Sequence, residues 1–380
     1  MNSGTNWLVR ATLVASGLIG TFGFFSVSAA LPVIEAAFAH ERYAALAATL
    51  IPGVTSLAFG LSAPFIGGLI DRHGYRLVYM SSLAAFAALG ISTGFMPNLI
   101  AVLIVRALTG AAIAGVIGAG SAGIASLPSE AQPGLFGLQA FLGGAAGIPL
   151  FPLTGLIAHA LGWRWVFVVY LVAIPALLAC PFLPRAGAST RAEAGPAPRL
   201  KLSPGLLLLS GFMGVAMFCA TAVMPFAIRA AATSDPALIS GPLVALSVVS
   251  LLGSGGYGFL ARKLGLQGIF ATALFCIGTG LLSCAVAHSL LAFSLGEGVL
   301  GFGVGMLMPN LNAVAAASAK GAEGRALSLV AAVIYGIQAL LPFIIWPLRQ
   351  MAGLSGALLL VAAVSLVLAA SMGFQLRRRL

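Results

Sequence analysis

The sequence predicts an all-α integral membrane protein in which twelve transmembrane helices form two pseudo-symmetric six-helix bundles. Three observations predict this fold. Of the 380 residues, 60% are hydrophobic and 7% are charged, and the mean hydropathy is +1.09, whereas soluble domains carry about 25% charged residues. Apolar segments recur along the chain with the length of about 20 residues that crosses a bilayer. An internal repeat divides the chain into two halves.

Clusters of charged, Pro and Gly residues separate the apolar segments and so predict the individual helices. In the first half the segments lie near 8–34, 43–70, 77–96, 98–126, 133–159 and 163–183. In the second half they lie near 204–229, 238–262, 267–287, 289–317, 324–349 and 353–376. The intervening stretch is rich in Pro and Arg and is typical of a flexible linker. We therefore expect an N-terminal bundle at 1–183, a cytoplasmic linker at 184–203 and a C-terminal bundle at 204–380.

The distribution of positive charge predicts the orientation in the membrane. Lys and Arg outnumber Asp and Glu by 19 to 8, and basic residues in short loops are retained in the cytoplasm. We expect the protein to lie in a plasma membrane, of the bacterial inner-membrane type, with both termini on the cytoplasmic side. In this orientation only Arg42, Arg164, Arg229 and Arg349 lie outside, and Arg106 lies within a span. The cations are spread along the chain rather than forming a stripe with interleaved aromatic residues, so we expect lipid contact and no nucleic-acid partner.

A charged, glycine-rich turn between the second and third apolar segments is the most distinctive motif. It reads Gly67-Gly68-Leu69-Ile70-Asp71-Arg72-His73-Gly74-Tyr75-Arg76. A related stretch from Gly258 to Gly265 links the eighth and ninth segments 191 positions later. Residues 28–32 likewise resemble residues 221–225, at an offset of 193, near the ends of the first and seventh segments. This repeat indicates a duplicated bundle, and it argues that the first apolar segment is a helix rather than a cleavable secretion signal.

The same offset aligns two charges of opposite sign inside predicted spans. Arg106 and Gly110 of the fourth span correspond to Glu297 and Gly301 of the tenth. Each charge lies about eight residues, or roughly 12 Å, inside its span, where an ionised group is costly unless it faces a cavity or a partner. Arg106 and Glu297 are therefore candidates for substrate binding, proton coupling or gating. The alternative is a structural ion pair, or two charges that carbonyl groups and water satisfy separately.

Taken together, these motifs resemble the major facilitator superfamily, whose members have two six-helix halves and a charged Gly-Asp-Arg-Gly-Arg loop after the second helix. The residues that match this loop are Gly67, Asp71, Arg72, Gly74 and Arg76. Arg106 and Gly110 match the fourth-helix Arg-x-x-x-Gly pattern, and residues 162–167 resemble the start of the sixth helix in the drug-antiporter branch. The sequence departs from that branch in two ways. The Gly and Pro residues of the fifth helix are displaced but still predict a bend, and the first span has no acidic residue near its middle.

The resemblance implies a monomeric secondary carrier that works by alternating access on a small-molecule substrate. It favours proton-coupled efflux of small hydrophobic or amphiphilic compounds. An uptake permease for a small organic anion or nutrient, or a non-transporting sensor of the same fold, is the alternative. The resemblance also implies that the loop motif, together with Gly110, acts as a conformational latch, and we expect Asp71 to meet the start of the eleventh span.

In such a fold the substrate cavity lies at the midplane between the helices of the two halves. Few polar or aromatic residues of this sequence fall there, and the candidates are Phe24, Phe25, Gln139, Tyr257, Asn310, Asn312, Tyr335 and Gln338. Each could instead pack or hydrogen-bond between helices. A lining of this kind suits an apolar or amphiphilic ligand, although Arg106 could receive an anion.

Glu297 is the one carboxylate well inside the predicted spans, so we expect proton coupling to depend on it. Burial favours the neutral acid, whereas a nearby Arg106 would favour the carboxylate. The four histidines fall at span ends, and no His, Cys or carboxylate residues have metal-ligand spacing. The sequence contains no phosphate-binding glycine-rich loop of the ATPase type. We therefore expect no enzymatic activity, metal or cofactor.

Overall fold

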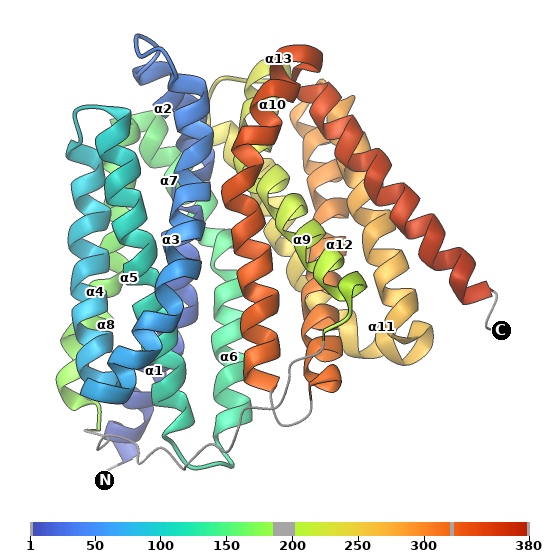
Figure 1. Ribbon diagram of the computed structural model, residues 1–380. Helices are drawn as coiled ribbons and strands as arrows, with labels where there is room; N and C mark the ends of the chain where they lie inside the picture. The colour runs from blue at the N-terminus through green and yellow to red at the C-terminus, as the bar shows by residue number, and fades with distance from the viewer. Residues whose placement is uncertain (1–2, 185–201, 320–322, 378–380) are drawn as a thin grey trace. The chain divides into compact units, whose positions relative to one another are not determined.

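Helices make up nearly all of the part of the chain that the computed structural model describes, which comprises residues 3–184, 202–319 and 323–377 (Figure 1). The contacts between residues divide the chain into two compact units, residues 1–194 and 195–380. This division falls within the stretch that the sequence predicts to be a linker. Most of that linker, with its four cations, lies outside the described residues, as do Lys320 and the last two arginines.

The N-terminal unit follows the predicted order of six apolar segments. Its elements are α1 (Ser3–Phe25), η1 (Ser28–Ala30), α2 (Leu31–Ala37), α3 (Ala44–His73), α4 (Tyr75–Ser92), η2 (Thr93–Phe95), α5 (Leu99–Ala125), α6 (Gln132–Ala145), α7 (Gly147–Leu161), η3 (Trp163–Ala173), α8 (Ile174–Ala179) and η4 (Cys180–Phe182). The fifth span is interrupted at Ala146, between α6 and α7, close to the Gly and Pro residues that predict a bend. Within this unit, α5 packs against α1, α3 and α4.

The described residues of the C-terminal unit form six elements. They are α9 (Pro204–Phe218), η5 (Cys219–Val223), α10 (Met224–Ala231), α11 (Pro236–Ala285), α12 (Leu290–Ser318) and α13 (Glu323–Arg377). Helix α12 packs against both arms of α11 and also contacts α9 and α13. Glycines permit the close approach, because a Cβ atom at Gly301 would overlap the carbonyl oxygen of Leu246, and one at Gly305 would overlap that of Ser250.

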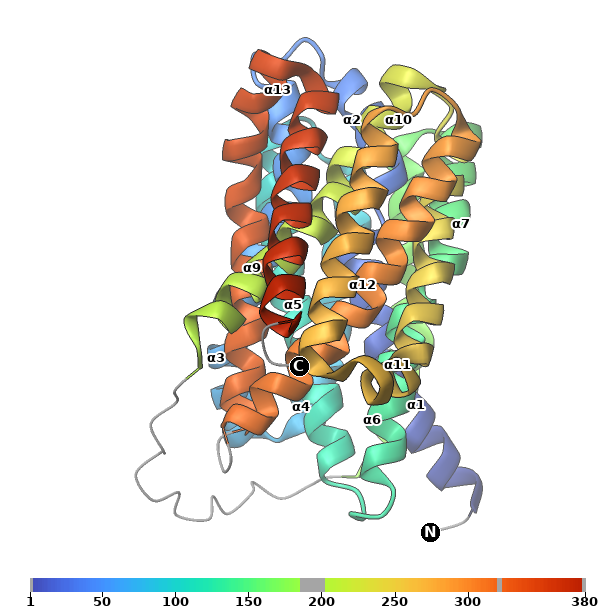
Figure 2. The ribbon, with the colours of Figure 1, turned by 90° about the vertical axis from the view of Figure 1, so that its right-hand side faces the viewer.

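The described residues contain ten helical stretches that are long and apolar enough to cross a membrane. Two of these stretches, within α11 and α13, have 50 residues, which at 1.5 Å per residue is roughly 75 Å, more than twice the thickness of a hydrocarbon core. Each contains one glycine with a positive φ angle, Gly265 (67°) or Gly353 (70°), where the helix turns back on itself (Figure 2). Counting the two arms separately gives the twelve segments that the sequence predicts.

Glycine turns repeat between the two units with the period found in the sequence. Among the described residues, the positive φ angles belong to Gly74 (78°), Gly162 (88°), Gly265 and Gly353. Gly74 precedes Gly265, and Gly162 precedes Gly353, by 191 positions in each case. Only glycine adopts this backbone conformation without steric cost, so the repeat preserves the sites where the chain reverses direction.

One expectation about the charged motif was wrong. The sequence suggests that the second helix ends near residue 70 and that a short charged loop follows. In the structure, residues 67–73 are the last turns of α3, and Gly74 alone separates α3 from α4. Arg72 and His73 lie in the last helical turn, where positive charge is favourable beside the unpaired carbonyl groups. Their charge therefore does not end the helix, and Gly74 does.

The first and seventh spans are both interrupted at equivalent positions. Helix α1 ends at Phe25 and a short η1 follows, whereas α9 ends at Phe218 and continues as the π-helical turn η5. Pro32 and Pro225 lie at the start of the helices that come next, α2 and α10. Proline has no N–H group and its ring clashes with the preceding turn, which explains why the helical pattern changes just before each of them.

Candidate functional site

Arg106 is fully buried in the N-terminal unit and is held by three other segments of that unit. Its ε nitrogen donates to Thr55 Oγ1 on α3 (3.1 Å), and one terminal nitrogen donates to the carbonyl oxygen of Gly23 on α1 (2.9 Å). The other terminal nitrogen donates to the Tyr170 hydroxyl on η3. All three guanidinium nitrogens therefore have acceptors inside the unit.

The position of Gly23 explains why a cation is stable at this depth. Gly23 lies in the last turn of α1, whose final carbonyl groups have no partner within the helix. These carbonyl groups carry partial negative charge, so a guanidinium at the end of the helix is electrostatically favourable. Arg106 thus caps the broken end of the first span.

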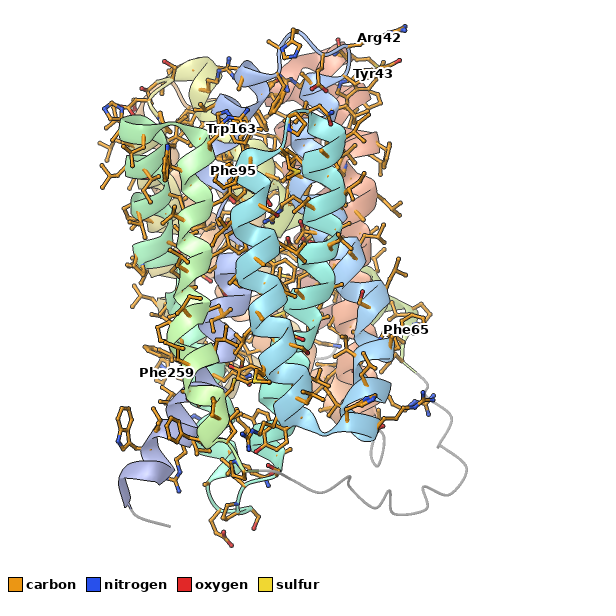
Figure 3. The ribbon with its side chains drawn as sticks, turned by 90° about the vertical axis from the view of Figure 1, so that its left-hand side faces the viewer. Arg42, Tyr43, Phe65, Phe95, Trp163 and Phe259 are labelled. Atoms are coloured by element: carbon orange, nitrogen blue, oxygen red, sulfur yellow. The ribbon has the colours of Figure 1, made fainter. Side chains whose placement is uncertain are left out.

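Two hydrogen bonds fix the start of α5, the helix that carries Arg106. The side chain of Asn98 accepts a hydrogen bond from the Ala101 N–H (2.8 Å), and Glu41 Oε1 accepts one from the Leu99 N–H (3.2 Å). Both contacts satisfy donors at the N-terminus of the helix. The labelled Arg42 and Tyr43, next to Glu41 in the chain, lie at the same end of the unit as Trp163 (Figure 3).

Glu297 is also fully buried, but its surroundings in the C-terminal unit differ from those of Arg106. Neither carboxylate oxygen has a hydrogen-bond partner among the described residues. The thiols of Cys219, at the start of η5, and of Cys284, on the second arm of α11, are near enough to interact electrostatically with Glu297. The carboxyl group therefore lies between helices, beside the π-helical turn of the seventh span, and has no strong donor in the part of the chain that the structure describes.

The internal repeat explains this contrast. The residues that hold Arg106, namely Gly23, Thr55 and Tyr170, correspond to Ala216, Leu246 and Val361 in the second half, at offsets of 193, 191 and 191. These three counterparts carry no side-chain donor. The backbone frame is nevertheless shared, because a Cβ atom at Gly110 would overlap the Thr55 carbonyl oxygen, just as one at Gly301 would overlap that of Leu246. Gly110 therefore has a packing reason to be glycine.

Three of the predicted substrate contacts take part in hydrogen bonds between helices. Gln139 Nε2 on α6 donates to Ser16 Oγ (2.7 Å) on α1 and to Ser121 Oγ (3.2 Å) on α5. Asn310 Nδ2 donates to the Leu266 carbonyl oxygen (2.9 Å), and its oxygen accepts from the Tyr257 hydroxyl (3.2 Å). Because Leu266 follows the turn glycine Gly265, this hydrogen bond connects the turn to α12.

The remaining candidates differ in how far they are buried. Phe24 is buried, with its ring edge-on to Phe59 of α3 (5.2 Å between centroids), whereas Phe25 is half-buried. On α12 and α13, Asn312 and Tyr335 are half-buried and Gln338 is buried.

Of the predicted latch residues, those of the loop motif lie together at the end of α3 and the start of α4, whereas Gly110 lies on α5. Asp71 and Arg72 are exposed and Arg76 is half-buried. A Cβ atom at Gly67 would have no neighbour within 4 Å. The latch role and the meeting of Asp71 with the eleventh span remain predictions.

Sequence reasoning missed Thr55, Ser26 and Tyr170, which complete the surroundings of Arg106. The Tyr170 hydroxyl donates to the Gly23 carbonyl oxygen (3.0 Å) and accepts from Ser26 Oγ (3.0 Å). The sequence did contain one signal for Tyr170: it is a tyrosine within an apolar span, and a buried hydroxyl needs a hydrogen-bond partner.

Comparison with known proteins places these features in a family. The model of the Major Facilitator Superfamily matches residues 13–342. The multidrug efflux pump PmrA of Streptococcus pneumoniae serotype 4 is 28% identical over 321 residues, which cover 78% of this chain and 79% of PmrA. The multidrug resistance protein MdtG of Citrobacter koseri is 27% identical over 289 residues, with coverage of 71% and 70%. The match to the antiporter QDR3 of Candida albicans is 31% identical over 161 residues and spans 42% of this chain but only 22% of QDR3.

Solved structures share the fold at low sequence identity. A transporter of the POT family in complex with 5-aminolevulinic acid superposes with a TM-score of 0.78 at 11% identity, covering 96% of this chain and 95% of that one. A D-xylose–proton symporter superposes with a TM-score of 0.77 at 16% identity, covering 96% and 97%. The family match over most of the sequence, together with the helical repeat, identifies this chain as a membrane transporter of the major facilitator superfamily.

Proposed function

We propose that the protein exports small hydrophobic or amphiphilic compounds in exchange for protons, by alternating access across a plasma membrane. The observation that carries the proposal is Glu297, a fully buried carboxyl group without a hydrogen-bond partner among the described residues. The names of the relatives PmrA and MdtG support export of drug-like compounds. The protein would act as a monomer with both termini in the cytoplasm.

The surroundings of Glu297 favour a change of protonation during transport. An ionised carboxylate without partners in an apolar environment costs far more free energy than the neutral acid. Glu297 would therefore hold a proton while it is buried beside η5 and α11 and release it when the cavity opens to water. One proton bound on one side and released on the other is the minimum that coupled exchange requires.

The environment of Arg106 argues against the uptake of an organic anion. Its three nitrogens already donate to Gly23, Thr55 and Tyr170. Binding of a carboxylate or phosphate substrate would have to break these buried hydrogen bonds, each of which involves a charged donor and contributes about 1.5–3 kcal/mol. Arg106 is therefore better suited to holding the first span than to holding a substrate.

The candidate lining suits an apolar ligand. Phe24 and Phe25 supply aromatic surface, and the polar groups of Gln139, Tyr257 and Asn310 are occupied by bonds between helices. Substrate affinity would then come mainly from the burial of apolar surface, at about 25 cal/mol per Å². Asn312, Tyr335 and Gln338 would add the few directional contacts. The cluster from Gly67 to Arg76 would act as the latch that closes the cytoplasmic side.

The test is transport by purified protein in proteoliposomes with an imposed pH gradient and a panel of labelled amphiphilic compounds. The wild type should concentrate at least one compound against its gradient. Glu297→Gln should abolish this uphill transport yet retain exchange of labelled for unlabelled compound, since the amide mimics the neutral acid. Glu130→Gln, a change to an exposed carboxylate, is the matched control and should behave as the wild type. Undiminished uphill transport by Glu297→Gln would remove Glu297 from the coupling role.

A further inference from the structure

The Tyr170 hydroxyl uses its full hydrogen-bonding capacity at the broken end of the first span. A phenol has one donor and two acceptor positions. Tyr170 donates to the Gly23 carbonyl oxygen (3.0 Å), accepts from Ser26 Oγ (3.0 Å) and accepts from a terminal nitrogen of Arg106. All three bonds are within the buried interior of the N-terminal unit, so no part of this hydroxyl depends on water.

These contacts hold the two ends of one short segment. Gly23 and Ser26 immediately flank Phe24 and Phe25, where α1 ends and the irregular turn before η1 begins. A helix end that lacks its own continuing hydrogen bonds needs outside partners to keep a single conformation. Tyr170 supplies such a partner on each side of the Phe24–Phe25 pair.

The ring of Tyr170 is itself held in one position. It packs against Phe86 (4.7 Å between centroids) and stacks on Phe167 at an interplanar angle of 29° (6.3 Å between centroids). On the facing helix α4, Gly90 makes room for the ring, because a Cβ atom at Gly90 would overlap it. The hydroxyl therefore has little freedom to follow the first span if that span moves.

The unusual helix that carries Tyr170 fixes its direction. Residues 163–173 form a 3₁₀ helix of 11 residues, although such helices rarely exceed four. Its sequence matches three residues per turn, since Trp165, Val168 and Leu171 are exposed. On the neighbouring face, Phe167, Tyr170 and Ala173 are buried at the same spacing. Burial with a period of three keeps Tyr170 on the face that meets α1 and α5.

We propose that Tyr170 is a positioning residue that sets substrate affinity by holding the Phe24–Phe25 turn through Gly23, Ser26 and Arg106. The inference rests on the proposed function, in which Phe24 and Phe25 contact the substrate. Tyr170 acts through these residues and does not itself touch the transported compound. Its role is separate from proton coupling, which the proposed function assigns to Glu297.

The test begins with hydrogen exchange of purified Tyr170→Phe, because this measurement needs no substrate. Exchange over residues 22–30 should accelerate by about tenfold, as expected when a buried hydrogen bond is lost. Tyr79→Phe is the matched control: it removes another buried hydroxyl that donates to a carbonyl oxygen of α1, that of Thr12 (2.7 Å), far from the turn. It should leave exchange over 22–30 unchanged. Equal exchange of Tyr170→Phe and wild type in this segment would overturn the proposal.

Transport kinetics then test the link to substrate. In Tyr170→Phe the KM for the exported compound should rise about three- to tenfold, with a nearly unchanged maximal rate and an unchanged pH profile. A lower maximal rate at constant KM, or an altered pH profile, would contradict a role in affinity. Absence of pH-driven transport by the wild type would refute the proposed function instead, and hydrogen exchange would still decide whether Tyr170 holds the turn.

Two further variants keep the test decisive if Tyr170→Phe folds poorly. Gly90→Ala should displace the ring while keeping the hydroxyl, and should raise both exchange over 22–30 and KM. Ser26→Ala removes one of the three bonds, and its effect on KM should not add to that of Tyr170→Phe, because both act through the same contact. Fully additive effects, or wild-type behaviour of Gly90→Ala, would count against the proposal.

Discussion

The two halves of this transporter have opposite charges at equivalent positions of a shared backbone frame, and the two charged groups differ in their hydrogen-bond partners. Arg106 has acceptors on three neighbouring segments, whereas Glu297 has no hydrogen-bond partner among the described residues. The frame itself is alike, with glycine turns at Gly74 and Gly265 and close helix packing at Gly110 and Gly301. The comparison indicates that the two halves share a backbone frame but differ in the residues around the charge. Under the proposed function, Arg106 holds the first span and Glu297 changes protonation.

The largest difference between the halves should appear in stability. Arg106→Ala would leave the Tyr170 hydroxyl, Thr55 and the Gly23 carbonyl oxygen without their charged donor and would create a cavity, at a cost of about 3–5 kcal/mol. Glu297→Gln should change stability by less than about 1 kcal/mol, because no partner is lost. Thermal unfolding of the detergent-solubilised variants measures both. Equal losses of stability in the two variants would show that the surroundings of the two charges do not differ in the way described.

The shared frame predicts symmetric effects of glycine substitutions. Gly110→Ala and Gly301→Ala each push a methyl group against a carbonyl oxygen of the neighbouring helix, which should cost about 1–3 kcal/mol in either variant. Gly67→Ala, where a Cβ atom meets nothing within 4 Å, is the control and should be neutral or stabilising by up to about 1 kcal/mol. Loss of stability in only one of the two halves would show that the packing is not equivalent.

Donors introduced near Glu297 should make it more like Arg106. Cys219→Ser replaces a weak donor beside the carboxyl group by a hydroxyl, and a hydrogen bond to the carboxylate favours the ionised form. The pH dependence of transport should then move to more acidic values, by about half a pH unit. Cys276→Ser changes a half-buried thiol on the same arm of α11 as Cys284, and should leave the pH profile in place. A shift to more alkaline values in Cys219→Ser would contradict the assignment.

The fold and the pair of charges could be predicted from the sequence because both depend on its 191-residue period. The turn glycines Gly162 and Gly353 keep that period, and the alignment of Arg106 with Glu297 follows from it. The partners of Arg106 could not be found in this way. Tyr170 lies in another span, and its repeat counterpart is Val361, so neither spacing nor symmetry points to it.

Local composition also misled the placement of the charged motif. A run with Asp71, Arg72 and His73 suggested a loop, yet these residues belong to the last turns of α3. Charge is tolerated where a helix reaches the membrane surface, and positive charge is favoured at a helix C-terminus. The backbone angle of Gly74, rather than the charges before it, ends the helix. For Gln139 and Asn310, the sequence predicts a position near the middle of a span. It does not show that the side-chain amides already form hydrogen bonds with neighbouring helices.

Infrared difference spectroscopy of the reconstituted protein can show whether Glu297 is protonated, because the carbonyl stretch of a carboxylic acid reports its protonation. We expect a band of a protonated carboxyl group at neutral pH that is present in the wild type and in Glu130→Gln and absent from Glu297→Gln. A wild-type spectrum without this band, or a band that persists in Glu297→Gln, would contradict the claim that the buried Glu297 holds a proton.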